Sequence, residues 1–299
     1  MTRFRERAAL RGSAWTALVF FTLIVVTGAA VRLTGSGLGC SRWPNCSDQS
    51  LTPQSGHAFI EFGNRLITTP VALSALAVLI CAVMQNQRRQ DYVKLGWSLV
   101  AIVAAQALLG AVAVWTELNW VSVAGHFLLS MVSLTICVVL VWRIEQERRT
   151  TPSVPVDGKF SLWSRAVASL GFAVIALGTL VTASGPYAGG EGTGDAVRRF
   201  SAFGGDTFPE MVMLHARAAA VFGALVLLLW ILARVRGAAV MTAALTVTCI
   251  VVAVSGVVGQ IQYHVLDYPA ALVWSHVALS AILWSCCVWI WLSAGPQRS

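Results

Sequence analysis

The chain alternates long apolar segments with short polar ones over its whole length. Eight apolar segments reach about twenty residues, the length that an α-helix needs to cross a hydrocarbon core of about 30 Å. They lie at residues 13–33, 64–84, 94–115, 121–142, 163–184, 209–232, 238–262 and 270–292. This pattern predicts an all-α polytopic membrane protein with eight transmembrane helices.

The composition supports the same class. Hydrophobic residues make up 57% of the chain and charged residues 11%, and the mean hydropathy is +0.73. A soluble domain of this length does not need so much apolar surface, so membrane lipid is the expected surrounding. The formal net charge is +8. Because Arg and Lys do not gather on one soluble face, the charge does not indicate a nucleic-acid partner.

The basic residues indicate how the helices are oriented. Most Arg and Lys residues fall on one side of the expected spans, together with both termini. The basic residues on the other side are Arg32, Arg42, Arg65, Arg198, Arg199 and Arg217. By the positive-inside rule we expect both termini in the cytoplasm and the chain in the plasma membrane. The first span is too long for a removable signal peptide and lacks a small-residue cleavage site, so we expect it to stay as the first helix.

A charged, proline-containing segment at residues 143–162 divides the chain and is typical of a cytoplasmic linker. Four apolar segments precede it and four follow it. We therefore expect an N-terminal half at residues 1–142 and a C-terminal half at residues 163–299.

Polar residues recur at matching places in the two halves. From Asn64 to His215 is 151 residues, and from His126 to His276 is 150 residues. Each of the four lies near one end of an apolar segment, and all are expected on the same side of the membrane. This repeat predicts two pseudo-symmetric four-helix bundles related by an axis along the membrane normal.

The histidines of the second half suggest a haem site. Haem iron takes two axial ligands on opposite faces of its ring, so a bundle supplies one imidazole from each of two helices. We expect His215 and His276 to be this pair, although either one alone is compatible with a core histidine bonded to a carbonyl. Arg217 is expected to pair with a haem propionate. Its alternative is an interface arginine that reaches toward polar surroundings.

The first half departs from this pattern. His126 has Asn64 where its histidine partner is expected, and an amide is a poor iron ligand. Glu61 lies about one helical turn before Asn64 and Arg65 directly follows it, so acid, amide and base share one helix end. One axial histidine, an open opposite face and a nearby carboxylate suit chemistry better than simple electron transfer. His57 is either a loop residue or a replacement ligand.

Two cysteines lie in the polar segment after the first apolar one. Five residues separate Cys40 from Cys46, and in an oxidising compartment they can close a small loop as a disulfide. Exposure there also permits redox exchange with a partner thiol. A zinc site is excluded because two further ligands are missing nearby.

The residues of this segment resemble a known family. The run from Val31 to Cys40, with Trp43, Pro44 and Cys46, closely resembles the first outer loop of bacterial haem A synthases. Residues 61–65 resemble that family's helix-two motif, in which glutamate is followed three residues later by histidine and then arginine. The resemblance spans nearly the whole chain and departs from the motif at Asn64.

The resemblance implies a reaction. Members of the family oxidise the C8 methyl group of haem O to a formyl group through successive hydroxylations, giving the haem A of terminal oxidases. The C-terminal half then holds haem b as a cofactor through His215 and His276. The N-terminal half receives haem O, with His126 on its iron, Asn64 and Arg65 at the substrate site, and Glu61 near the reacting edge. The disulfide shapes this site or passes electrons.

Partners follow from the same resemblance. A haem O synthase must supply the substrate, and a redox partner must take part. The Trp-rich helix faces leave room for a homo-oligomer. Two other functions compete with the enzyme: a b-type membrane cytochrome that only relays electrons, and a haem carrier without chemistry of its own.

Overall fold

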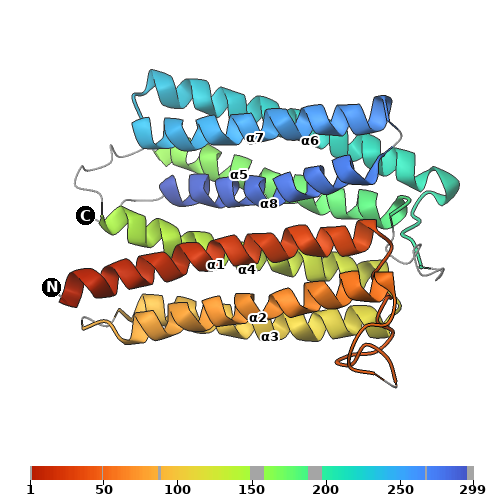
Figure 1. Ribbon diagram of the computed structural model, residues 1–299. Coiled ribbons are helices and arrows are strands. Elements are labelled where there is room, and N and C mark those ends of the chain that lie inside the picture. Colours follow the sequence, from red (N-terminus) through yellow and green to blue (C-terminus); the bar gives the residue numbers. More distant parts are fainter. Residues whose placement is uncertain are drawn as a thin grey trace. The chain divides into compact units, whose positions relative to one another are not determined.

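The computed structural model describes residues 2–48, 50–86, 89–148, 158–187, 197–266 and 268–294, with the side chains of residues 2–4 left out. Eight α-helices account for almost all regular structure in this part of the chain (Figure 1). They are α1 (Thr2–Leu33), α2 (Gly56–Val83), α3 (Gln90–Trp115), α4 (Trp120–Glu147), α5 (Gly158–Ser184), α6 (Thr207–Val235), α7 (Ala239–His264) and α8 (Ala270–Ser293). A short 3₁₀ turn, η1 (Gly204–Asp206), precedes α6. All eight helices are long and apolar enough to cross a membrane, which confirms the expected all-α multi-pass membrane protein.

Several helices extend beyond the apolar segments that predicted them. Helix α2 begins at Gly56, where the hydroxyl of Ser55 accepts a hydrogen bond from the backbone N–H of Ala58 at 3.2 Å. This N-cap satisfies one of the free N–H groups at the helix end. Glu61 and Asn64 therefore lie inside the helix rather than at its mouth, which corrects the sequence-based position.

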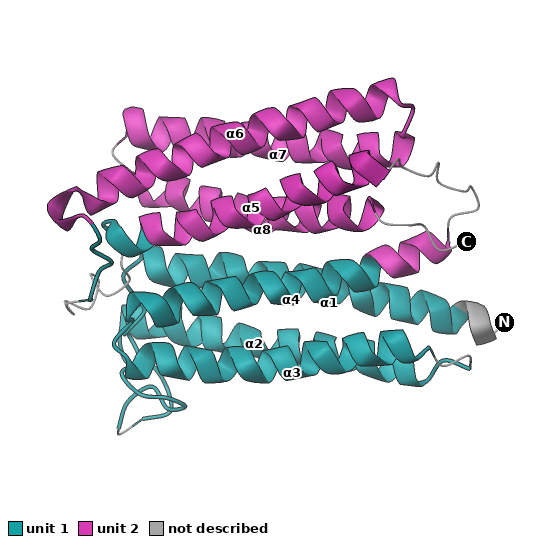
Figure 2. Ribbon diagram, turned by 180° about the vertical axis from the view of Figure 1, so that it is seen from behind, with its two compact units in different colours: residues 1–141, 182–202 teal, residues 142–181, 203–299 magenta. Residues whose placement is uncertain are grey.

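The chain forms two compact units (Figure 2). Unit 1 comprises residues 1–141 and 182–202, and unit 2 comprises residues 142–181 and 203–299. The segment after α5 is bound to unit 1 by Arg32, whose Nε donates to the carbonyl of Tyr187 at 2.9 Å and whose Nη2 donates to that of Thr182 at 3.2 Å. The division into halves at residues 143–162 stays a prediction.

In unit 1, α2 packs against α1 and α3. From residue 10 to residue 25 the buried residues of α1 recur every three or four positions and define one face; they are Leu10, Ala14, Ala17, Phe21 and Val25. Small residues allow close approach, which matters in a membrane because helices there associate mainly by van der Waals packing. At Gly96 of α3, an added Cβ would lie 2.9 Å from the Cα of Leu79 in α2.

In unit 2, α7 packs against α6 and α8. The buried cluster draws on α5 to α8, with Phe222, Leu229, Leu245 and Cys287 among its members. Helices α5 and α8 meet at Gly171, where an added Cβ would lie 2.7 Å from the Sγ of Cys287. These contacts hold the four helices at fixed rotations about their axes, and the rotations decide which side chains meet inside the unit.

Candidate functional site

The structure brings together the two histidines of the second half. His215 lies in α6 and His276 in α8, both in unit 2. Their ring centroids are 6.1 Å apart and their planes make an angle of 78°. A metal–imidazole bond is about 2 Å long, so two rings bound to opposite sides of one ion have centroids on the order of 6 Å apart. The observed spacing therefore fits a bis-histidine haem.

Each of these rings is held by a backbone carbonyl. The Nδ1 atom of His215 lies 3.1 Å from the carbonyl oxygen of Val174 in α5. The Nδ1 atom of His276 lies 3.1 Å from that of Ser255 in α7. Because a carbonyl only accepts, Nδ1 carries the proton in both rings and the lone pair of Nε2 is available to a metal. Metal-binding histidines are oriented by this kind of second hydrogen bond.

His126 of the first half lacks such a bond. Its Nδ1 is buried in α4 and has no hydrogen-bond partner among the described residues. Gln106 of α3 lies beside it and donates from Nε2 to the hydroxyl of Ser130 at 3.0 Å and to the carbonyl of His126 at 3.4 Å. The Oε1 atom of Gln106 is also buried without a partner in the described chain. Among the described residues, therefore, no hydrogen bond to Nδ1 orients this imidazole.

Asn64 of α2 is bonded to α1. The hydroxyl of Thr27 donates to the Oδ1 atom of Asn64 at 2.7 Å. The amide is thus satisfied by a neutral partner, and it offers iron a much weaker donor than imidazole does. The first half therefore presents one imidazole from this pair of positions, as the sequence indicated.

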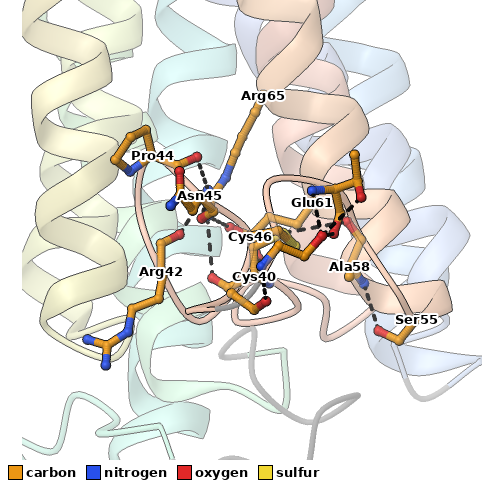
Figure 3. Close-up of a disulfide and its surroundings, with 12 residues drawn as sticks. Cys40, Arg42, Pro44, Asn45, Cys46, Ser55, Ala58, Glu61 and Arg65 are labelled. Atoms are coloured by element: carbon orange, nitrogen blue, oxygen red, sulfur yellow. Dashed lines mark hydrogen bonds and ion pairs between the residues drawn. A yellow bond between two sulfur atoms is a disulfide. The ribbon is translucent and has the colours of Figure 1, made fainter.

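The segment between α1 and α2 is closed by the disulfide between Cys40 and Cys46, which confirms that prediction. Both cysteines are buried. The carboxylate of Glu61 accepts a hydrogen bond from the backbone N–H of Cys40 at 2.7 Å and forms an ion pair with Arg65 (Figure 3). Glu61 is only 6% exposed, so these two donors satisfy a carboxylate that burial would otherwise leave without partners.

Arg65 binds the backbone of the same loop. Its Nη1 donates to the carbonyls of Arg42 at 3.0 Å and Asn45 at 3.2 Å, and its Nη2 approaches the carbonyl of Cys40 at 3.4 Å (Figure 3). One guanidinium thus connects α2, the buried carboxylate of Glu61 and the disulfide loop. The planar group with five donors is suited to several acceptors at once.

The remaining histidines and Arg217 lie outside the pairs of positions described above. His57 lies in the first turn of α2, and its Nδ1 is 2.8 Å from the hydroxyl of Ser36. His264 is the last residue of α7. Arg217 is exposed. Residues two positions apart in an α-helix lie about 200° from each other around its axis. Arg217 therefore does not share a helix face with His215.

Sequence reasoning missed several residues that touch the expected ligands. The sequence could not identify the carbonyls of Val174 and Ser255 as acceptors, because every residue has a backbone carbonyl. Thr27 and Gln106 were detectable in principle, since a hydroxyl or an amide inside an apolar span needs a hydrogen-bond partner.

The sequence of the chain is similar to those of known proteins. A family model described as cytochrome oxidase assembly protein, COX15-CtaA, matches residues 12–58 and 49–288. A protein named heme A synthase from Geobacillus thermodenitrificans is 32% identical over 134 residues, which cover 44% of this chain and 42% of that protein. The heme A synthase of Lysinibacillus sphaericus is 33% identical over 178 residues, covering 58% of this chain and 57% of the relative.

The heme A synthase of Geobacillus kaustophilus is 34% identical over 114 residues, or 38% of this chain and 36% of the relative. The chain thus matches between 36% and 57% of the length of these three relatives. The family model, in contrast, spans most of the sequence and includes the disulfide loop, Glu61 and all three expected ligand histidines. On this evidence the chain belongs to the COX15-CtaA family of cytochrome oxidase assembly proteins.

Proposed function

We propose that this membrane protein is a haem A synthase, which oxidises the C8 methyl group of haem O to a formyl group and so provides haem A for terminal oxidases. Membership of the family and the names of the relatives support this function. The observation that carries it is the difference between the two histidine sites. One site has two hydrogen-bonded imidazoles, and the other has a single imidazole without such a bond beside an amide.

The second half is the site of a resident haem b. The Nε2 atoms of His215 and His276 would bind its iron, and the carbonyls behind each Nδ1 keep the two rings oriented. Bound haem b supplies one-electron redox chemistry. Arg217, at the exposed flank of α6, is the candidate partner for a haem propionate.

The first half receives haem O as the substrate. His126 binds its iron, and Asn64 leaves the opposite face without a second imidazole. A substrate must enter and its product must leave, so weaker binding is an advantage here. This reasoning favours a site with one strong ligand over a site with two.

Glu61 is the residue that we assign to the chemistry. Its carboxylate is buried and is held in one orientation by the N–H of Cys40 and by Arg65. A carboxylate in such a place accepts protons from the reacting group or stabilises positive charge that develops on it. Arg65 belongs to the same substrate site and keeps the disulfide loop over it.

The cellular setting follows from the charge distribution. With both termini in the cytoplasm and the helices in the plasma membrane, the disulfide loop lies on the oxidising outer side, where disulfides persist. There the disulfide shapes the substrate site or exchanges electrons with a redox partner. A haem O synthase is the expected source of the substrate.

The test is to produce the protein in cells that make haem O but not haem A, and to separate the extracted haems by chromatography with mass detection. We expect haem A with the wild-type chain. In Glu61→Gln we expect haem A to fall by about a hundredfold or more, while haem b stays bound. Glu210→Gln, at an exposed position in the first turn of α6, is the control and should leave haem A unchanged. Haem b alone, with haem O supplied and untouched, would instead indicate an electron-transfer protein or a carrier.

A further inference from the structure

Each histidine of the second half packs against a glycine on the preceding helix. A Cβ added at Gly178 of α5 would lie 3.3 Å from the Cε1 atom of His215. A Cβ added at Gly259 of α7 would lie 3.5 Å from the Cε1 atom of His276. Both imidazoles therefore lie directly on helix backbone rather than on side chains.

The carbonyls that bind these rings have a fixed relation to the glycines. Val174 is four residues before Gly178, and Ser255 is four residues before Gly259. Residues four apart lie on the same helix face, one turn from each other. Because glycine has no side chain, the helix surface one turn from the carbonyl that accepts the bond from Nδ1 is open to the ring. We call each combination a glycine–carbonyl pair: Gly178 with the carbonyl of Val174, and Gly259 with that of Ser255.

The same glycines recur in the first half. A Cβ added at Gly110 of α3 would lie 3.5 Å from the Cε1 atom of His126, and one added at Gly28 of α1 would lie 3.9 Å from the Nδ2 atom of Asn64. Gly28 and Gly178 are 150 residues apart, and Gly110 and Gly259 are 149 apart. A glycine therefore lies beside each of the four repeated positions. The hydrogen bond to Nδ1, in contrast, appears at the two positions of the second half.

We propose that Gly178 and Gly259 are positioning residues of the haem b site. Gly178 leaves no room for a Cβ, and Gly259 leaves room for a methyl group but not for a larger side chain. Each thereby lets its histidine reach the carbonyl of the glycine–carbonyl pair, which fixes the proton on Nδ1 and leaves Nε2 to bind the iron. This inference rests on the proposed haem b site, and it assigns to the two glycines a role that acts through the histidines.

Close helix packing is the competing explanation for a buried glycine, and unit 2 contains an example of it. Gly171 faces the Sγ atom of Cys287 and the ring of Phe222, so its role is to let α5 approach its neighbours. At Gly178 and Gly259, by contrast, the nearest atoms are those of the histidine rings. Substitution there should change the haem ligand before it changes the packing of the helices.

The test uses the full chain, purified in detergent with its haem. Gly178→Val and Gly259→Val place methyl groups between ring and carbonyl. We expect both variants to change the low-spin ferric resonance signal of haem b and to shift its midpoint potential. We also expect haem b to pass to apomyoglobin about ten- to a hundredfold faster, the usual cost of removing a partner behind a metal ligand. Gly256→Val is the matched control on α7, because an added Cβ there meets nothing within 4 Å; it should behave as wild type.

Alanine variants keep the inference testable if the valine variants do not fold. At Gly178 a Cβ at 3.3 Å forces the ring to move, whereas at Gly259 a Cβ at 3.5 Å makes ordinary contact. We therefore expect Gly178→Ala to alter the resonance signal and Gly259→Ala to leave it unchanged. A folded Gly178→Val or Gly178→Ala protein with wild-type signal, potential and haem release would overturn the inference. A wild-type protein without low-spin haem b would overturn the proposed haem b site itself, which is a different outcome.

Discussion

The two halves place ligand residues at matching helix positions but hold them differently. In the second half, His215 and His276 each bond to a carbonyl through Nδ1. In the first half, the Nδ1 atom of His126 has no partner in the described chain, and Asn64 bonds to the hydroxyl of Thr27. The two halves thus share the positions of these residues but differ in their hydrogen bonds, and in the proposed function this difference separates a retained haem from an exchanged one.

The halves also differ in what lies next to these positions. The first half has a disulfide loop joined to α2 by a buried carboxylate and an arginine. The corresponding segment of the second half, residues 187–208, contains no cysteine in its sequence. On this difference rests our proposal that the chemistry belongs to the first half and the redox cofactor to the second.

Removing one ligand from each half is the strongest way to break the comparison. His276→Ala should lower the haem b content of the purified protein by about a hundredfold, because losing a ligand costs at least as much as losing the partner behind it. His126→Ala should leave haem b in place and abolish haem A formation. The haem content of both variants, measured by extraction, checks this. Equal loss of haem b from the two variants would contradict the assignment of resident and substrate sites.

Restoring a histidine to the first half should make the halves alike. In Asn64→His the new ring would lie over Gly28. The carbonyl of Ile24, four residues earlier, already accepts a hydrogen bond from the hydroxyl of Thr27 at 3.2 Å, and Nδ1 would share this acceptor. We expect a second low-spin signal in spectra of the haem-loaded protein and product release slower by about tenfold. Asn64→Leu, which supplies no ligand, is the control and should show no second signal. Faster release with unchanged activity in Asn64→His would refute the idea that the open face helps the product to leave.

A smaller effect is expected from changing the arginine that holds the loop. Arg65→Lys keeps the positive charge but loses the planar guanidinium that donates to several carbonyls. We expect this loss to destabilise the closed loop by about 1 kcal/mol. Limited proteolysis of the disulfide loop should then be about fivefold faster. Arg42→Lys is the control, since its ion pair with Asp48 is exposed and contributes little. If both variants are cleaved at the wild-type rate, Arg65 does not hold the loop.

Much of the fold could be predicted because hydropathy marks the stretch of each helix that crosses the membrane. Helix ends could not be found in this way. The start of α2 is set by Ser55, which lies in a polar segment where hydropathy carries no information. Helix α7 likewise continues to His264, two residues beyond the apolar segment that predicted it.

The spacing of His126, His215 and His276 predicts candidate ligand positions, but it could not predict the hydrogen-bond partners of these residues. Backbone carbonyls are present at every residue, so only the rotation of one helix against another shows that Val174 and Ser255 are the acceptors. The role of Arg65 was hidden likewise. The motif that Arg65 shares with Glu61 suggested a contact with the substrate haem. Only the structure shows that Arg65 donates to carbonyls of the disulfide loop.

The central claim is that one haem is resident and the other is exchanged. The most direct test is to load the purified wild-type chain with haem b and haem O, add an excess of apomyoglobin, and follow the transfer of each haem by extraction and mass detection. The account predicts that haem b leaves more slowly than haem O by about tenfold or more. Equal rates, or faster loss of haem b, would contradict it.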